Sequence, residues 1–307
     1  MNILIAGASG FIGRNLVKAL QNNHNLTVLG RSSTGLEKIF PKGVKICSWD
    51  SLANLDPNTY DAVINLCGHN IGASRWNAKV KQKLIDSRVN TSKDLIDWAI
   101  KQGAKPHFYC ANAIGIYGLQ ENGDPQAFDE NSTINFNNPP DFLTEIAVRW
   151  QNAMQPAIDQ GMDVTITRFG VALQKGEGML KKLSPSFFFG LGAAIGDGKQ
   201  ILSWVHVDDI VSAYLFLLGH PKLTGAFNVT APNPLSQAEF AQTLAKAMHR
   251  PLFLKIPGFV ISSIFGEMGE YLLLKGQRVI PKRLEEEGYQ FIYPDLAGAL
   301  NHEFEVR

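Results

Sequence analysis

Three glycines at a spacing of three residues, close to the start of the chain, constrain its fold more than any other feature. Gly7, Gly10 and Gly13 directly follow the apolar run Ile3 to Ile5, and apolar residues then recur at helical spacing. A strand, a glycine-rich turn and a helix in this order form the context in which such glycines bind a dinucleotide. One glycine permits the tight turn, one lets backbone approach the pyrophosphate, and one allows close packing of helix on strand. We therefore predict a dinucleotide-binding unit, in which the helix that starts near Phe11 directs its free N–H groups and positive end toward the phosphates.

Apolar runs of strand length alternate with helical patterns over the first half of the chain. We expect strands at Ile3–Ile5, Leu26–Leu29, Val44–Cys47, Ala62–Leu66, Pro106–Cys110 and Val164–Arg168, with long helices at Asn77–Lys101 and from an Asp141 cap to about Gln160. This alternation predicts an α/β protein with a Rossmann-type, doubly wound parallel sheet. We assign residues 1–170 to this Rossmann domain and residues 171–307 to a smaller C-terminal substrate lobe, and we expect parts of 200–235 to return to the first domain.

The second half carries weaker signals. We expect a strand at Ala226–Val229 and helices at Ile210–Leu218, Ser236–Met248 and Phe259–Leu274. Asp208 or Asp209 is the expected N-cap of the first of these helices, and His206 is the expected buried structural group. Ser236, with Glu239 three residues later, has the pattern of a capping box. The loop over residues 111–140 is long and without periodicity, which is typical of a functional or mobile segment.

The overall charge excludes some partners. Lys and Arg number 29 against 28 Asp and Glu, for a formal charge of +1, so we expect no nucleic-acid partner. No apolar run reaches membrane-spanning length, and the first strand begins too early to leave room for a leader. The cysteines Cys47, Cys67 and Cys110 lack metal-ligand spacing and are expected to be core residues of a reduced, cytoplasmic protein without a metal. A homodimer is common for such folds, but no residue indicates one here.

The ends of the expected strands supply the rest of the cofactor site, because ligands of such sheets lie outside the carboxyl ends of the strands. Arg31 and Ser32 stand where NAD-binding proteins usually place a carboxylate for the ribose 2′-hydroxyl. A cation there suits the 2′-phosphate of NADP, so we favour NADP(H) over NAD(H). The full predicted cofactor set is Gly7, Ser9, Gly10, Phe11, Ile12, Gly13, Arg31, Ser32, Asp50, Leu66, Cys67 and Gly68.

Motifs over nearly the whole chain carry a family resemblance. Gly7-x-x-Gly10-x-x-Gly13, Tyr117-Gly118 and Trp204-x-His206-x-Asp208-Asp209 resemble the extended short-chain dehydrogenase/reductase superfamily. A narrower set resembles its atypical NAD(P)-dependent epimerase/dehydratase-like branch, which is related to sugar-nucleotide epimerases. That set is Ser87-Arg88-Val89, Asp141-Phe142-Leu143, Gly196-x-Gly198-x-Gln200 and Gly276-Gln277-Arg278-Val279-x-Pro281-Lys282-Arg283-Leu284.

The resemblance implies a catalytic tyrosine, a lysine four residues later and a Ser or Thr after the fifth strand. This chain has none of these three residues at the corresponding positions. By spacing, Leu143 occupies the tyrosine position, Ala147 the lysine position and Asn112 the Ser/Thr position. Asparagine donates a hydrogen bond but cannot exchange a proton. Leu202 stands where sugar-nucleotide epimerases place the arginine that clamps the pyrophosphate, so a nucleoside-diphosphate sugar is not the expected substrate.

These departures leave the reaction open. The first hypothesis is an NADP(H)-binding, epimerase- or reductase-like protein that acts on a small carbonyl or hydroxyl compound at a non-standard site. Tyr117 is the candidate proton donor and Asn112 the candidate residue that binds the substrate. His69, Glu145 or a water molecule could donate the proton instead. The alternative interpretation of Tyr117 is a packed aromatic residue without a catalytic role. The second hypothesis is a non-catalytic, NADP(H)-responsive binding or regulatory protein.

Two further groups have open interpretations. The basic residues Arg278, Lys282 and Arg283 form either a solvated face or a site for an anionic substrate group. The aromatic run Phe187 to Phe189 belongs either to the core or to a pocket wall.

Overall fold

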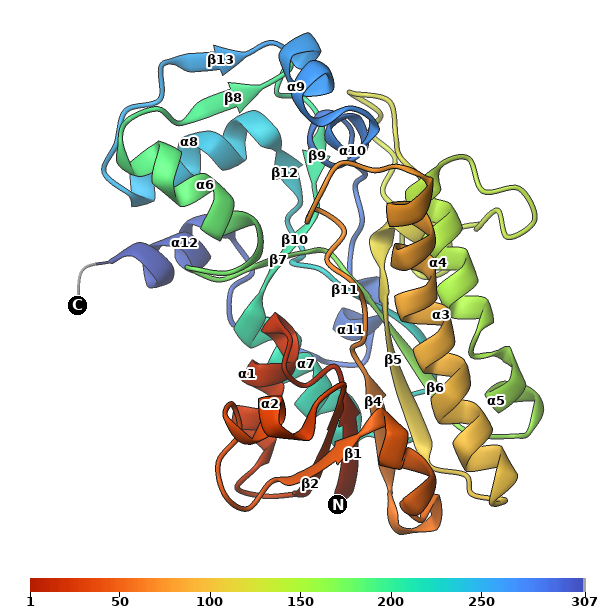
Figure 1. Cartoon of the computed structure of the whole chain (residues 1–307). Coiled ribbons are helices and arrows are strands. Elements are labelled where there is room, and N and C mark those ends of the chain that lie inside the picture. Colours follow the sequence, from red (N-terminus) through yellow and green to blue (C-terminus); the bar gives the residue numbers. More distant parts are fainter. Residues whose placement is uncertain (306–307) are drawn as a thin grey trace.

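A seven-stranded parallel sheet forms the centre of the structure, a computed structural model that describes residues 1–305 (Figure 1). Its strand order is β11-β6-β5-β4-β1-β2-β3. The strands are β1 (Asn2–Ala6), β2 (Asn25–Gly30), β3 (Lys45–Ser48), β4 (Ala62–Asn65), β5 (His107–Ala113), β6 (Val164–Phe169) and β11 (Gly225–Val229). Successive strands are added on one side of β1 and then on the other, so the predicted Rossmann-type, doubly wound fold is confirmed.

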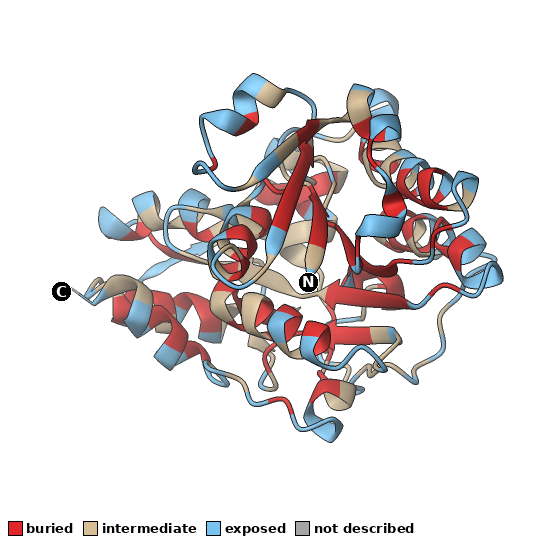
Figure 2. Ribbon diagram, turned by 90° about the horizontal axis from the view of Figure 1, so that it is seen from below, coloured by how far each residue is buried: buried red, intermediate tan, exposed pale blue. Residues whose placement is uncertain are grey.

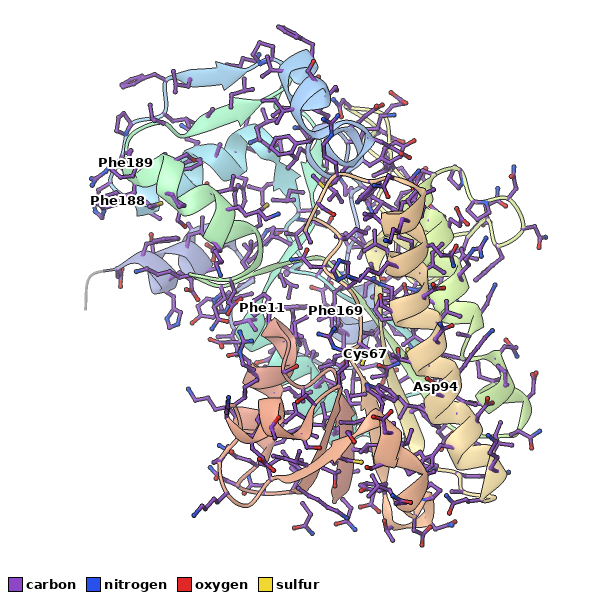
Figure 3. All side chains as sticks on the ribbon, viewed as in Figure 1. Phe11, Cys67, Asp94, Phe169, Phe188 and Phe189 are labelled. Atoms are coloured by element: carbon purple, nitrogen blue, oxygen red, sulfur yellow. The ribbon has the colours of Figure 1, made fainter. Side chains whose placement is uncertain are left out.

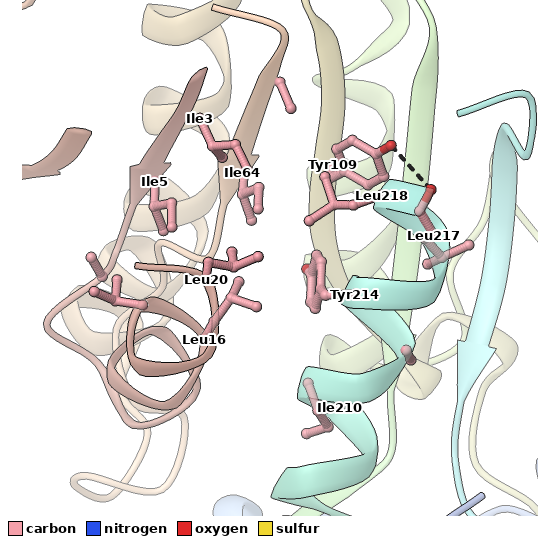
Figure 4. Packing of buried hydrophobic residues seen from close by; sticks show 14 of the residues in the cluster. Ile3, Ile5, Leu16, Leu20, Ile64, Tyr109, Ile210, Tyr214, Leu217 and Leu218 are labelled. Carbon is pink, nitrogen blue, oxygen red and sulfur yellow. Dashed lines mark hydrogen bonds between the residues drawn. The ribbon is translucent and has the colours of Figure 1, made fainter. Parts of the chain in front are cut away.

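Helices cover both faces of this sheet. Figure 1 shows α1 (Phe11–Leu20) and α7 (Val207–Gly219) on one side and α3 (Ala78–Lys101), α4 (Phe142–Asn152) and α5 (Gln155–Asp159) on the other. The strand residues alternate between two hydrophobic clusters. Ile3 and Ile5 pack with Leu16 of α1 and Tyr214 of α7 (Figure 4), whereas Leu4 belongs to the opposite cluster. Because both faces are covered, the central strands β1, β4, β5 and β6 are almost entirely buried (Figure 2).

The two long helical patterns behave differently. Asn77 caps α3 by accepting a hydrogen bond from the Val80 N–H at 2.9 Å, so that helix follows the prediction. The second pattern is divided into α4 and α5. Pro156 stands in the first turn of α5, where the missing N–H of proline costs nothing, whereas inside one continuous helix it would break the ladder.

The second lobe consists of short paired strands and helices above the main sheet (Figure 1). The strand pairs are β7 (Val171–Leu173) with β10 (Trp204–His206), β9 (Ile201–Leu202) with β12 (Leu235–Ser236), and β8 (Ala193–Ile195) with β13 (Leu254–Ile256). The helices are α6 (Gly178–Phe188), α8 (Gln237–Ala247), α9 (Gly258–Phe265), α10 (Glu267–Gly269) and α12 (Leu296–Phe304), together with the π-helical turn η4 (Glu270–Leu274). The short helices α2 (Ser33–Glu37) and α11 (Lys282–Glu286) lie against the main sheet.

One helix cap differs from the prediction. Neither Asp208 nor Asp209 caps α7, because the His206 ring nitrogen Nδ1 accepts the hydrogen bond of the Asp208 N–H at 3.2 Å. His206 is buried and its Nε2 lies 2.8 Å from Glu303, which confirms its structural role. The buried Asp209 carboxylate accepts hydrogen bonds from the backbone N–H groups of Ile292 and Tyr293 at 2.6 and 3.0 Å. Asp209 therefore fastens the C-terminal segment to α7.

Other predictions in the second half have mixed outcomes. The capping box of Ser236 and Glu239 is present at the start of α8. The expected helix over Phe259–Leu274 is interrupted, because Gly266 adopts φ +60° between α9 and α10. Phe187 is a core residue, whereas Phe188 and Phe189 are exposed at the outer edge of the lobe (Figure 3). Within residues 1–305, no helix combines the length and apolarity needed to cross a bilayer.

Candidate dinucleotide site and adjoining cavity

The glycine turn between β1 and α1 is shaped by close backbone contacts. Gly7 has φ +78°, and a Cβ there would lie 2.7 Å from the backbone carbonyl carbon of Leu66. A Cβ on Gly13 would lie 2.5 Å from the Gly7 carbonyl oxygen, so α1 packs directly on the turn. Gly10 is less crowded, since its nearest neighbour would be 3.2 Å away, and it is the N-cap of α1 without a side-chain cap. The first turn of α1 therefore keeps its N–H groups for an anion, as a pyrophosphate site requires.

The ends of β2 and β3 place the predicted adenosine-side residues at one edge of the sheet. Gly30 and Ser48 are partners in the β2–β3 ladder, and Arg31 and Asp50 follow shortly after them and are exposed. Ser32 caps α2 by accepting a hydrogen bond from the Gly35 N–H at 3.2 Å. This edge presents a guanidinium beside the end of β2 and no carboxylate at the Arg31 position.

The loop after β4 runs beside the glycine turn. The Leu66 N–H donates to the Ala6 carbonyl at 2.9 Å, and the Cys67 N–H donates to the Asn65 side chain at 3.0 Å. Phe11 of α1, Cys67 of this loop and Phe169 of β6 lie near the strand ends, below the second lobe (Figure 3). Burial raises the pKa of the Cys67 thiol to about 12, so it is a neutral group and not a thiolate nucleophile at neutral pH. The predicted cofactor residues are thus brought together along one edge of the sheet.

The structure places both candidate catalytic residues in structural networks. The Tyr117 hydroxyl is buried, donates to the Asn228 side chain at 2.8 Å and accepts from Arg168 at 2.7 Å, and its ring stacks on Phe128. Burial raises the pKa of Tyr117, which works against proton transfer. The Asn112 amide donates to the Ala147 carbonyl at 3.1 Å and ties β5 to α4. This geometry gives no support to a catalytic role for either residue.

The other candidate proton donors, Glu145 and His69, lie outside the cavity lining. Glu145 forms an ion pair with Arg149 at 2.7 Å on the surface of α4. The backbone N–H of His69 donates to the Ser87 hydroxyl at 2.9 Å, and burial, followed by the charges of nearby cations, lowers the pKa of its ring. Neither residue lines the cavity described below.

Replacing Tyr117 with phenylalanine tests whether its hydroxyl stabilises the fold rather than takes part in catalysis. Tyr117→Phe leaves a buried arginine N–H and the Asn228 oxygen without their partner, so we expect a loss of about 1–3 kcal/mol in the free energy of unfolding. Urea titration measures this change, and NADPH affinity should not move. Tyr60→Phe is the matched control, because it removes a single bond between buried neutral hydroxyls (3.0 Å to Thr27) and should cost less. Unchanged stability together with lost turnover would instead make Tyr117 catalytic.

A cavity of about 320 Å³ lies at the carboxyl ends of β5 and β6, where the second lobe meets the sheet. The chain departs from the superfamily pattern at four positions, and three of them, Leu143, Ala147 and Leu202, line this cavity, whereas Asn112 does not. The volume is at the lower end of the range for small-molecule sites. Three of the four departures are therefore collected in one mostly apolar space.

Residues that the sequence analysis did not assign to a site supply the polar part of the wall: Arg88, Ser203, Tyr271, Lys275 and Gln277. The guanidinium of Arg88 lies over the Trp150 ring, with its carbon 5.1 Å from the ring centroid, and donates to the Leu84 carbonyl at 2.9 Å. A Cβ added to Gly68 would lie 3.1 Å from the same guanidinium, so Arg88 borders both the cofactor loop and the cavity. The only sequence signal for Arg88 was its place in the Ser87-Arg88-Val89 motif.

The strap formed by residues 275–280 closes the cavity from the second lobe. The Gly276 carbonyl accepts the Gln120 N–H at 2.9 Å, and the Arg278 N–H donates to the Gln120 side chain at 2.6 Å. Gly276 passes so close to the Ile201 carbonyl that no Cβ fits there. The Ser203 hydroxyl donates to the Gln277 carbonyl at 2.9 Å. These contacts hold Lys275 and Gln277 in the cavity wall.

The basic residues after the strap have structural partners. Lys282 pairs with Asp129 at 3.2 Å. Arg283 donates to the Ala226 carbonyl at 3.2 Å and lies 4.0 Å from the centroid of the Phe227 ring. Among the described residues, no group of three or more His, Cys, Asp or Glu is placed to hold a metal ion.

The parallel doubly wound sheet, the glycine turn at a free helix N-terminus and the adjoining cavity define a dinucleotide-binding α/β protein. Residues 3–230 match the model of the NAD dependent epimerase/dehydratase family, and residues 256–303 match a domain of unknown function, DUF1731. The chain belongs to the NAD dependent epimerase/dehydratase family. The sequence resemblance to the atypical extended short-chain dehydrogenase/reductase branch is thereby confirmed.

Relatives match over almost the full length of the chain. An epimerase family protein of Mycobacterium leprae is 35% identical over 304 residues, which cover 98% of this chain and 94% of that protein. The human epimerase family protein SDR39U1 is 32% identical over 303 residues, which cover 98% of each. An Arabidopsis thaliana homologue of the human protein, named as chloroplastic, is 36% identical over 98% of this chain and 86% of its own length.

Solved structures agree with the fold. The crystal structure of human SDR39U1 with NADPH has a TM-score of 0.87 and 30% identity, and the match covers 99% of both chains. The Thermus thermophilus UDP-glucose 4-epimerase complex with NAD has a TM-score of 0.77 at 15% identity over 99% of this chain and 98% of that one, a likeness of fold alone.

Proposed function

We propose that the chain binds NADP(H) in preference to NAD(H) and acts on a small carbonyl or hydroxyl compound in the cavity, without a Tyr-x-x-x-Lys pair on α4. The observation that carries this proposal is the position of Arg88, whose guanidinium borders both the cofactor loop at Gly68 and the cavity. A ligand in the cavity would therefore lie next to the cofactor. The human relative with a TM-score of 0.87 was crystallised with NADPH, which supports the choice of cofactor.

Each part of the cofactor site has a distinct task. Gly7 and Gly13 hold the turn, Gly10 and the first turn of α1 offer N–H groups to the pyrophosphate, and Arg31 offers its guanidinium to a 2′-phosphate. Bound NADP(H) supplies or accepts a hydride.

The chain's contribution to proton transfer would come from the second lobe. Leu143 and Ala147 make the α4 side of the cavity apolar, which excludes water from it. Tyr271 and Lys275 are the lining phenol and amine, and the Lys275 ammonium lies 5.9 Å from the centroid of the Tyr271 ring. We assign Tyr271 as the candidate proton donor in place of Tyr117.

The test is a titration of the purified protein with NADPH and NADH, followed by a screen of carbonyl compounds against the NADPH complex. We expect NADPH to bind more tightly than NADH and some carbonyl compound to oxidise it, and Tyr271→Phe to slow that oxidation without changing NADPH affinity. Tight binding without any oxidation would favour the non-catalytic, NADP(H)-responsive alternative. Absence of binding of either nucleotide would overturn the proposal.

Two sequence predictions also stand as proposals. We propose a cytoplasmic location, which imaging of a tagged chain in its own cells would test. We propose a homodimer, and sedimentation of the purified chain would contradict it by giving the monomer mass.

A further inference from the structure

We propose that the cavity selects a small amphipathic acid, in which a carboxylate is held by Arg88 and Lys275 and an apolar body fills the rest of the space. This inference rests on the proposed function and names the substrate class of the same site. It differs from the nucleoside-diphosphate sugars of the family's named epimerases, because Leu202 replaces the pyrophosphate-clamping arginine.

The charged side chains that line the cavity all carry positive charge. Arg88 from α3 and Lys275 from the strap both line the cavity, and none of the lining residues, all within the described part of the chain, is acidic. Glu270 lies outside this lining set and 3.7 Å from the Lys275 ammonium, a long ion pair with both side chains partly exposed. The cavity therefore presents net positive charge to a ligand.

Arg88 retains donors for a ligand. Within residues 1–305, the Leu84 carbonyl is the single hydrogen-bond acceptor of its guanidinium, and the Trp150 ring fixes the orientation of its plane. Burial lowers the pKa of Arg88 to about 10, so the group remains charged at neutral pH. Arg88 is partly shielded from solvent and has no counter-ion, which is costly, and a ligand carboxylate bound side-on by the remaining N–H groups would offset that cost.

The rest of the wall specifies the body of the ligand. Ile146, Phe169, Leu202 and Leu272 are among the lining residues that offer apolar surface. One carboxylate on such a ligand is satisfied by a fork of N–H groups and one ammonium.

The experiment uses calorimetry on the NADPH-loaded protein with acids and their neutral partners. The probes are phenylpyruvate against phenylacetone, and pyruvate against acetone, so that each pair differs by a carboxylate in place of a methyl group. We expect at least one acid to bind at least about tenfold more tightly than its partner, as loss of one charge-assisted hydrogen bond implies.

Variants test whether Arg88 and Lys275 cause the tighter binding of the acids. Arg88→Gln and Lys275→Met should each weaken acid binding by about tenfold and leave the neutral partners unchanged. Arg149→Gln is the matched control, since it removes one positive charge from the exposed surface of α4 and should change nothing.

The outcomes separate this inference from the proposed function. If NADPH does not bind, the proposed function fails. If NADPH binds but each acid binds no better than its neutral partner, or no acid binds, the inference alone fails. It also fails if Arg88→Gln weakens NADPH rather than the acid, because Arg88 would then belong to the cofactor site.

Discussion

Gly10→Val should reduce the affinity for both NADPH and NADH by at least about 100-fold, because a side chain at this position would stand between the pyrophosphate and the first turn of α1. The loss of two charge-assisted hydrogen bonds to the pyrophosphate corresponds to a change in affinity of about this size. Gly10 has φ −73° and ψ 174°, a region that valine adopts readily, and its nearest neighbour would be 3.2 Å away. The variant should therefore fold. Fluorescence titration with each nucleotide measures the loss.

The control is Gly219→Val at the end of α7, where an added Cβ meets no atom within 4 Å. That variant should bind both nucleotides as the parent does. Retained affinity in a folded Gly10→Val protein would contradict the pyrophosphate assignment. Gly7 and Gly13 are poorer test positions, because side chains there would collide with backbone and unfold the turn.

Arg31→Ala should weaken NADPH binding by about 10- to 100-fold and leave NADH binding nearly unchanged, since a hydrogen-bonded charge pair is worth about 1.5–3 kcal/mol. The reason is that NADPH alone presents a 2′-phosphate to this edge of the sheet. The ratio of the two dissociation constants is the quantity to measure, because it cancels any general disturbance of the fold.

Arg31→Lys provides the matched control. It keeps the charge but loses the planar fork, so it should restore part of the NADPH preference. Equal losses for NADPH and NADH in Arg31→Ala would show that Arg31 only shapes the loop after β2, and the preference for NADP(H) would then need another source.

The fold could be predicted from the sequence where local patterns and packing agree. The glycine turn is an example, since Gly7 and Gly13 are required by backbone contacts within a contiguous stretch. The N-cap of α7 could not be predicted in the same way. Aspartate is a favoured cap, but Asp209 is used by backbone N–H groups more than eighty residues away, which no local pattern reveals.

The residues of the cavity were likewise only partly predictable from local sequence patterns. The spacing of the superfamily pattern points to Leu143, Ala147 and Leu202, and it therefore indicates which catalytic and substrate-binding groups the site lacks. Arg88 and Lys275 line the cavity from a helix and a strap that are distant in sequence, and only the fold brings them to the same cavity. Tyr117 follows a strand that faces the cofactor, which makes it a candidate proton donor, but its hydroxyl is hydrogen-bonded to Arg168 and Asn228.

The strap of residues 275–280 also sets an order of events during synthesis. The glycine turn precedes Lys275 and Gln277 by most of the length of the sequence, so it leaves the ribosome well before them. N-terminal units generally fold first as a chain is made. The nucleotide cradle can thus form on a nascent chain that still lacks one wall of the cavity, and a ribosome that stalls before the strap would leave a product able to hold cofactor but not to enclose a substrate.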